Sequence, residues 1–169
     1  CTNENLGKTH LVSHKIDTGN AVPVKSKQFR IPFRQKEELG RIVQEMKNDG
    51  VIVESKSPWS ANMFLVKKKD GSLRPVVDYR GSNAVTKTDV YPLPRIDESI
   101  DSLSGSQFFS TLDLRSGYWQ IPMDADSQEK TAFTTPLGHF EFCVMPFGIK
   151  NAPADFQRVM EMALSGLQY

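Results

Sequence analysis

The sequence predicts an α+β fold in which an antiparallel sheet packs on helices. Two stretches, residues 63–79 and 131–144, alternate apolar and polar residues on either side of turn residues, which is typical of β-hairpins. Two others, residues 37–49 and 153–167, repeat apolar residues at helical spacing. With 169 residues, the chain is long enough to bury a substantial core.

The composition argues against a membrane protein. Hydrophobic residues make up 38% of the chain, with no long apolar run and no basic-then-apolar leader, so we expect a soluble, intracellular protein without a membrane partner. Two cysteines, Cys1 and Cys143, form no disulfide framework. The chain begins without Met and stops at Tyr169 soon after a helical pattern, so we expect a fragment of a longer polypeptide.

Charge is unevenly distributed, although the net charge is only +1. Residues 25–41 carry six Lys or Arg and two Glu, residues 67–80 carry five Lys or Arg and two Asp, and residues 89–101 carry four acids and one Arg. A charged run is commonly a solvated face. Basic walls opposite an acidic centre are also what a polyanion and its metal ions require.

Residues 1–34 have little periodicity and are expected to form an extended connector with room for a short strand. His10 and His14 are four residues apart, but no third ligand lies nearby, so surface positions are favoured over a zinc site.

The helix at 37–49 should have acids in its first turn and end at Gly50. Its apolar face consists of Leu39, Ile42, Val43 and Met46.

The hairpin at 63–79 turns at Asp70-Gly71 and carries lysines near its tip. Pro75 cannot donate to a neighbouring strand, so its strand is expected at a sheet edge. The lysines could bind a polyanion or could protect that edge from aggregation.

Farther on, residues 91–94 open a helix, with Pro94 in a tolerated first position. The apolar stripe that should back the sheet consists of Ile96, Ile100 and Leu103.

The apolar and aromatic run from Phe108 to Leu112 predicts a buried strand that ends at one carboxylate, Asp113. The four residues 115–118, Arg-Ser-Gly-Tyr, are turn residues whose N–H groups can point outward, beside a large aromatic ring. A single Asp at a strand end is more often a turn or helix N-cap residue than a metal ligand.

Residues 145–153, MPFGIKNAP, lead from the second hairpin into the last helix, with Pro153 in its first turn. The Phe147-Gly148 turn lets another backbone or a base approach closely, because glycine has no side chain. A plain strand-to-helix turn explains the same residues.

These motifs resemble those of reverse transcriptases and occur in the same order, most strongly over residues 58–160. Residues 108–123 are similar to the first carboxylate motif, 66–83 to the fingers hairpin, and 145–153 to the motif that lines the nucleotide and template grip. Phe147 stands where retroviral enzymes carry Gln, which indicates the Pol polyprotein of a gypsy-type LTR retrotransposon. The resemblance implies a right-hand polymerase fold, with the fingers and part of the palm.

The resemblance also implies a two-metal polymerase site. Asp113 and the Leu114 carbonyl would hold Mg²⁺, with Mn²⁺ as the alternative ion, and the Ser116 and Gly117 N–H groups would face the phosphates. Tyr118 would lie under the incoming sugar and exclude a ribose 2′-hydroxyl.

The resemblance also implies which other residues contact the nucleotide and the template. Lys68 and Arg74 match the triphosphate-binding positions, although the turn is one residue shorter than in retroviruses, which leaves Lys67 or Lys69 as substitutes for Lys68. The remaining positions are Phe147 at the nucleotide, Asp78 and Arg80 as a structural and template-side pair, and Gly148 and Pro153 at the template and primer.

By the same resemblance, the fingers are discontinuous. The expected parts are a connector at 1–34, fingers at 35–87, palm at 88–120, fingers at 121–151 and a palm helix at 152–169. The expected partners are an RNA template, a DNA primer, deoxynucleoside triphosphates and the rest of a Pol polyprotein, including the remaining palm, thumb and RNase H. The expected location is the cytoplasm, within a virus-like particle.

Half of the implied metal site lies outside these residues. In the family, a Tyr-x-Asp-Asp hairpin follows the helix that begins near Pro153, and residues 1–169 contain no Asp-Asp pair. We therefore expect polymerase activity of the full-length protein and none of the fragment alone. The alternatives are a nucleic-acid-binding remnant of a decayed or domesticated element, and a noncatalytic scaffold.

Overall fold

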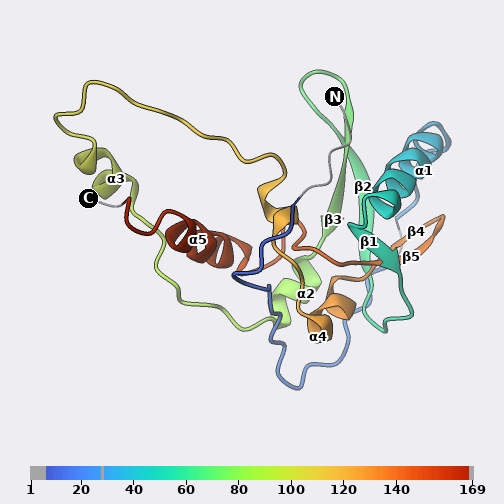
Figure 1. Cartoon of the computed structure of the whole chain (residues 1–169). Helices are drawn as coiled ribbons and strands as arrows, with labels where there is room; N and C mark the ends of the chain where they lie inside the picture. Colours follow the sequence, from blue (N-terminus) through green and yellow to red (C-terminus); the bar gives the residue numbers. More distant parts are fainter. Residues whose placement is uncertain (1–6, 28, 168–169) are drawn as a thin grey trace.

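Five strands form one mixed sheet (Figure 1). The computed structural model describes residues 7–27 and 29–167. The strands are β1 Ile52–Glu54, β2 Ala61–Lys67, β3 Leu73–Asp78, β4 Phe133–Thr135 and β5 Gly138–Phe142. Their order is β1-β5-β4-β2-β3, and every pair is antiparallel except β2 with β4. The α+β class is confirmed, but the sheet is not purely antiparallel, because the two hairpins meet through their first strands and these run the same way.

The predicted hairpins both form. In the first, Val66 pairs with Arg74, and Gly71 takes a positive φ of 86° in the turn, which glycine adopts without strain. The Asp70 carboxylate accepts hydrogen bonds from the Ser72 amide and hydroxyl, which lowers the pKa of Asp70. β3 lies at the sheet edge, as Pro75 predicts.

The longest helix, α1, lies against the sheet and contacts β1 and β3 (Figure 1). It buries the four apolar residues predicted from the sequence, and Leu39 is fully enclosed. It begins at Phe33, earlier than predicted, because Pro32 marks its start, so the first turn contains no acid.

The helices are α1 Phe33–Asn48, α2 Arg80–Val85, α3 Ile96–Ser102, α4 Ala125–Gln128 and α5 Ala152–Ala163, with 3₁₀ turns η1 Gly117–Gln120 and η2 Glu129–Thr131. Among the described residues, no helix is both long and apolar enough to cross a bilayer.

The N-terminal connector runs extended along the domain from residue 7 to residue 27. It forms single parallel bridges from His14 to Met123 and from Lys25 to Ser60. His14 is fully buried, and its Nδ1 lies 2.7 Å from Oδ2 of Asp155 on α5. The surface position predicted for His14 is therefore wrong, because a buried carboxylate provides its partner, whereas His10 is exposed as predicted.

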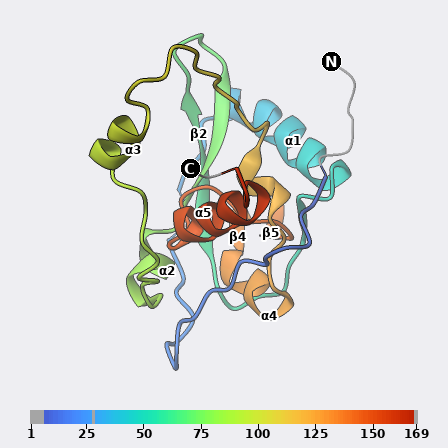
Figure 2. The same cartoon turned by 60° about the vertical axis from the view of Figure 1, so that its left-hand side comes forward.

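Residues 90–115 form an arm that leaves the packed part of the molecule, and both views show α3 standing apart from the sheet (Figures 1 and 2). The stripe on α3 is exposed rather than packed on the sheet: Ile96 is 77% exposed. The buried strand predicted over residues 108–112 is absent. The side chain of Phe108 is 93% exposed and that of Leu112 is 88% exposed. A strand needs a hydrogen-bonded neighbour, and none of the five strands in the described part of the chain pairs with this segment.

Candidate nucleotide and nucleic-acid site

The turn into η1 depends on a close approach to α5. Ser116 has a left-handed backbone (φ 49°, ψ 44°), and its carbonyl accepts a hydrogen bond from the Trp119 amide at 2.8 Å. A Cβ on Gly117 would lie 2.9 Å from a ring carbon of Phe156. The position therefore requires glycine, and the turn brings Tyr118 against α5.

Tyr118 is the centre of an aromatic cluster. Its ring stacks on Phe147, with centroids 5.0 Å apart and planes inclined by 20°, and Phe156 lies 5.2 Å away in a tilted arrangement. Tyr118 is half-buried, whereas Phe147 is 59% exposed. The cluster thus packs on α5 through Phe156, and Phe147 is its most exposed member.

The Phe147-Gly148 turn is held by a residue that the sequence analysis missed. Asn83, in α2, donates its Nδ2 hydrogen to the Gly148 carbonyl at 2.9 Å, and its Oδ1 accepts from the Lys150 amide at 2.8 Å. Gly148 has a φ of 85°, which favours glycine. The available signal was the place of Asn83 at the end of the motif 66–83, where an amide side chain can both donate and accept hydrogen bonds.

A cavity of about 400 Å³ joins three of the predicted positions: Arg74 from β3 and the Phe147-Gly148 turn line it together. Trp119 also lines it, next to Tyr118, and sequence reasoning did not single it out. A cation, three aromatic rings and a glycine therefore surround one space.

The predicted pair of Asp78 and Arg80 forms a two-pronged ion pair, with Nε to Oδ1 at 2.8 Å and Nη2 to Oδ2 at 2.7 Å. These hydrogen bonds lower the pKa of Asp78. Arg80 remains mostly exposed and, with Asn83 and Gly148, lines a second hollow of about 730 Å³. The structure thus shows the pairing, and contact with a template stays a prediction.

Lys68 and Pro153 are among the predicted positions that lie outside the cavity. Lys68 is in the exposed tip of the hairpin, where its amide donates to the Ser72 carbonyl at 2.7 Å. Lys67 and Lys69 are exposed as well, so the three lysines remain equivalent candidates. Pro153 is exposed at the second position of α5.

The metal side of the site is incomplete in these residues. Asp113 is exposed in the unpaired arm, and its neighbour Leu114 is 43% exposed. Over residues 7–27 and 29–167, no three His, Cys, Asp or Glu side chains gather as a metal site. A carboxylate and a carbonyl are the hard oxygen ligands that Mg²⁺ prefers, but they are fewer than its octahedral shell needs. The described donors therefore fit a magnesium ion in part.

Comparison with known proteins identifies the relatives of this chain. A family model described as reverse transcriptase (RNA-dependent DNA polymerase) matches residues 66–169. The Retrovirus-related Pol polyprotein from transposon 297 of Drosophila melanogaster is 43% identical over 169 residues, which cover 97% of this chain and 16% of that protein. The enzymatic polyprotein of cauliflower mosaic virus (strain Strasbourg) is 41% identical over 144 residues, covering 83% of this chain and 21% of the polyprotein.

Solved structures show the same fold. The prototype foamy virus protease-reverse transcriptase (CSH mutant) superimposes with a TM-score of 0.86 at 26% identity, covering 96% of this chain and 22% of that chain. The foamy viral enzyme in complex with an RNA/DNA hybrid gives a TM-score of 0.79 at 25% identity, over 96% of this chain and 22% of that one. The chain thus spans only 16–22% of the length of these four proteins.

Proposed function

The chain belongs to the reverse transcriptase family, and we propose that it forms the fingers and the first part of the palm in the RNA-directed DNA polymerase of a gypsy-type LTR retrotransposon. The observation that carries this proposal is the cavity that Arg74, Phe147 and Gly148 line beside the Tyr118 stack. It combines a cation for phosphates with rings for a sugar and base.

In this proposal, the nucleotide lies over the aromatic cluster. Arg74 and one of the hairpin lysines, with Lys68 as the first candidate, neutralise the triphosphate from the exposed side. The amides of Ser116 and Gly117 face the phosphates, and Tyr118 lies under the sugar, where Phe156 prevents it from moving aside. A ribose 2′-hydroxyl would then meet the ring, so selection of the sugar is steric.

The metal side would be completed by residues beyond those described. Asp113 and the Leu114 carbonyl would hold Mg²⁺ or Mn²⁺, which when bound neutralises charge that develops on the phosphate oxygens. The chain's own share is to place the nucleotide so that a primer 3′-hydroxyl can lie in line with its phosphorus. Without a second carboxylate pair, we expect residues 1–169 alone to be inactive.

The foamy viral enzyme binds an RNA/DNA hybrid in one solved structure and double-stranded DNA in another. We extend these partners to this chain, with Arg80, Gly148 and Pro153 on the template and primer side. The division into fingers at 35–87 and 121–151 and palm at 88–120 and 152–169 is part of the proposal. So are the cytoplasmic location and the rest of the polyprotein as partner.

The test is primer extension on an RNA template. The full-length polymerase that contains this chain should add deoxynucleotides, whereas residues 1–169 alone should add none. Synthesis by the isolated chain that depends on Asp113 would overturn the predicted inactivity. Binding of template and primer by the full-length protein without any synthesis would instead favour the nucleic-acid-binding remnant.

Sugar selection gives a second readout. Tyr118→Val in the full-length enzyme should raise ribonucleotide incorporation, because the smaller side chain leaves room for the 2′-hydroxyl. Tyr91→Val is the matched control, since Tyr91 lies outside the aromatic cluster of Tyr118 and its hydroxyl donates to Glu161. If Tyr118→Val selects deoxynucleotides over ribonucleotides as well as the unmodified enzyme does, this would contradict the place of Tyr118 under the sugar.

A further inference from the structure

Residues 83–89 and 148–151 are far apart in the sequence, but side chains join them along a seam. Within the residues that the structure describes, every hydrogen bond across this seam uses the side chain of Asn83, Lys150 or Asn151. These side chains pair backbone groups that a neighbouring strand would otherwise have to satisfy. The two segments are therefore held together by three side chains rather than by a β-ladder.

Asn151 holds the other segment at two points. Its Nδ2 donates to the Lys87 carbonyl at 2.8 Å, and its Oδ1 accepts from the Asp89 amide at 3.0 Å. Asn is a preferred residue at a helix N-cap because its side chain can accept from the first amides of the helix. At the start of α5 the side chain of Asn151 makes no such bond. It thus serves the seam and not the helix.

The backbone of Asn151 is strained. Its φ of 69° lies in the left-handed region, which few residues other than glycine adopt. Over residues 7–27 and 29–167, the only other non-glycine residue with a positive φ is Ser116, in the turn that leads to Tyr118. Such conformations persist where surrounding contacts impose them, and they gather at functional sites. Asn151 follows the Phe147-Gly148 turn by three residues, so both strained residues lie beside the candidate site.

The seam continues along α5. Arg158 donates to both oxygens of Asp89, and its guanidinium lies 4.3 Å from the ring centroid of Tyr91. The Tyr91 hydroxyl donates to Glu161. The segment that leads into the arm is therefore tied to α5 along most of the helix.

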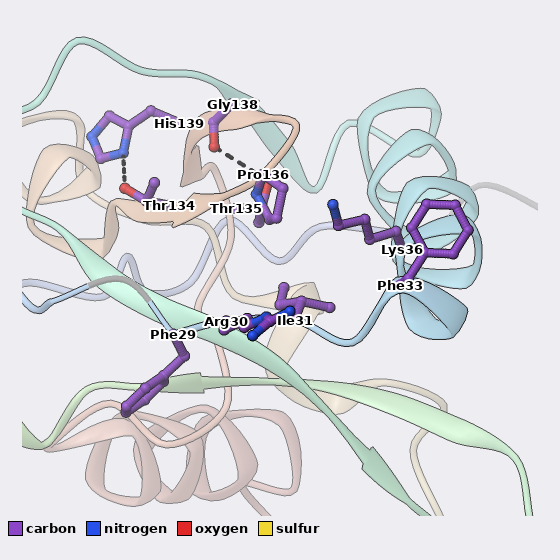
Figure 3. Close-up of a pocket in the computed structure, with 10 residues that line it drawn as sticks. All are labelled: Phe29, Arg30, Ile31, Phe33, Lys36, Thr134, Thr135, Pro136, Gly138 and His139. Atoms are coloured by element: carbon purple, nitrogen blue, oxygen red, sulfur yellow. Dashed lines mark hydrogen bonds between the residues drawn. The ribbon is translucent and has the colours of Figure 1, made fainter.

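The sheet on the other side of the seam is held differently. Its strands are joined by backbone ladders, and side chains add to them. Figure 3, at the pocket between the start of α1 and the β4–β5 turn, shows His139 of β5 bonded to Thr134 of β4, with Nδ1 2.9 Å from the hydroxyl. The other ring nitrogen of His139 lies 3.1 Å from the Ser57 carbonyl. Backbone ladders thus fix the sheet, whereas side chains alone fix the seam.

The seam coincides with the boundary between the proposed fingers and palm. Asn151 is the last residue of the second fingers part, and it bonds on both sides of the crossing between residues 87 and 88. The candidate site is divided in the same way, since Arg74 and Phe147 belong to the proposed fingers and Tyr118 to the palm. The stack of Phe147 on Tyr118 spans the boundary. The geometry of the site therefore depends on how the seam joins the two parts.

We propose that Asn151 is a positioning residue of the polymerase. By joining the two crossings, it fixes Arg74 and Phe147 in the fingers relative to Tyr118 in the palm, so that a bound nucleotide stays in line with the primer 3′-hydroxyl. Asn151 acts through these residues and does not touch the reacting atoms itself. This inference rests on the proposed function, because it uses the division into fingers and palm.

The experiment compares single-nucleotide addition by the full-length polymerase and by its Asn151→Gly variant in a pre-steady-state burst. Glycine adopts the left-handed backbone without strain, so this substitution removes the side-chain bonds and keeps the turn. The rate per active enzyme should fall about tenfold, since a displacement of about 1 Å at a reacting centre can cost on the order of 100-fold. The burst amplitude, which measures the active fraction, and the affinity for the primer–template should stay unchanged. Asn151→Asp keeps the acceptor for the Asp89 amide and should recover part of the rate.

Thr131→Val is the matched control. The Thr131 hydroxyl also bonds twice to backbone groups, as donor to the Gln128 carbonyl and as acceptor from the Phe142 amide, but it is buried within the fingers. The loss of these bonds should lower the thermal unfolding midpoint and leave the rate per active enzyme unchanged. A role in stability alone would make Asn151→Gly behave in the same way.

A second measurement needs no activity. Spin labels at Asn48, the exposed last residue of α1, and at Met162, exposed near the end of α5, report the distance between the fingers and the palm. In the full-length protein, the distribution of this distance should broaden in Asn151→Gly and stay the same in Thr131→Val.

A rate per active enzyme in Asn151→Gly within about twofold of the unmodified enzyme would overturn the inference. So would a loss confined to the burst amplitude, an equal loss of rate in Thr131→Val, or an unchanged distance distribution. Extension by the unmodified polymerase tests the proposed function separately.

Discussion

The packed sheet and the arm at residues 90–115 contain similar aromatic and apolar residues but differ in structure. Phe133 in β4 is fully enclosed, with its ring centroid 5.9 Å from that of Phe140 and 5.3 Å from that of Phe142. Phe108, in the arm, is 93% exposed. The difference shows that an apolar run becomes a strand only when another strand lies beside it.

The same difference separates the two halves of the candidate site. The aromatic and cationic half is built on packed elements, since Tyr118 rests on α5 and Arg74 belongs to β3. The metal half depends on Asp113, in the arm. We therefore expect the nucleotide half to be preorganised and the metal half to be fixed only by contacts beyond the described residues.

The largest expected effect concerns activity alone. Asp113→Asn in the full-length polymerase should lower the extension rate on the order of 10³-fold, because an amide cannot replace a charged metal ligand worth several kcal/mol. The thermal unfolding midpoint should stay unchanged, because the side chain is exposed. Asp101→Asn, another exposed acid of the arm, is the control. Extension within tenfold of the unmodified enzyme would remove Asp113 from the metal site.

Sequence patterns predicted the helix and hairpins of the packed sheet well because their signals are local. The helical spacing from Leu39 to Met46 and the Asp70-Gly71 turn each specify an element without reference to distant residues. The strand ending at Asp113 failed because a strand requires a neighbour that a linear pattern does not supply. His14 was misplaced for a related reason: its partner Asp155 is 141 residues away. Asn83 was missed because its contacts with the Gly148 turn are also distant in sequence.

The second prediction compares the two phenylalanines directly. Phe133→Ala should lower the free energy of unfolding by about 3–5 kcal/mol, because it leaves a cavity in the core. Phe108→Ala should change that free energy by less than about 0.5 kcal/mol. Urea denaturation of the 169-residue chain measures both. Similar losses in the two variants would mean that the arm is packed in solution.

The third prediction concerns the carboxylate that joins the connector to α5. Asp155 accepts from His14 and lies 2.7 Å from Arg158, so Asp155→Asn should reduce the free energy of unfolding by about 3 kcal/mol. Asp17→Asn is the control, since Asp17 pairs with Lys87 at the surface. The same denaturation measurement applies, and an equal effect of the two substitutions would show that the buried contact adds nothing.

The smallest expected effect depends on pH. Arg158 donates to both oxygens of Asp89, at 2.6 and 3.0 Å, which lowers the pKa of Asp89 in the folded state. A carboxyl whose pKa is lowered by folding contributes stability above its unfolded pKa of about 4, and this contribution is lost as the pH falls through the folded value. Asp89→Asn should therefore narrow the difference between the urea midpoints at neutral and acidic pH. An unchanged difference would assign the acid sensitivity to other carboxyl groups.

The buried contact between His14 and Asp155 also bears on the order in which the protein acquires its structure during synthesis. A contact across 141 residues closes late, because the intervening chain must be made and its loop entropy overcome first. The segment around His14 therefore leaves the ribosome before α5 and reaches its final place only once α5 has been translated. Until then it remains free for chaperones or nascent partners to hold.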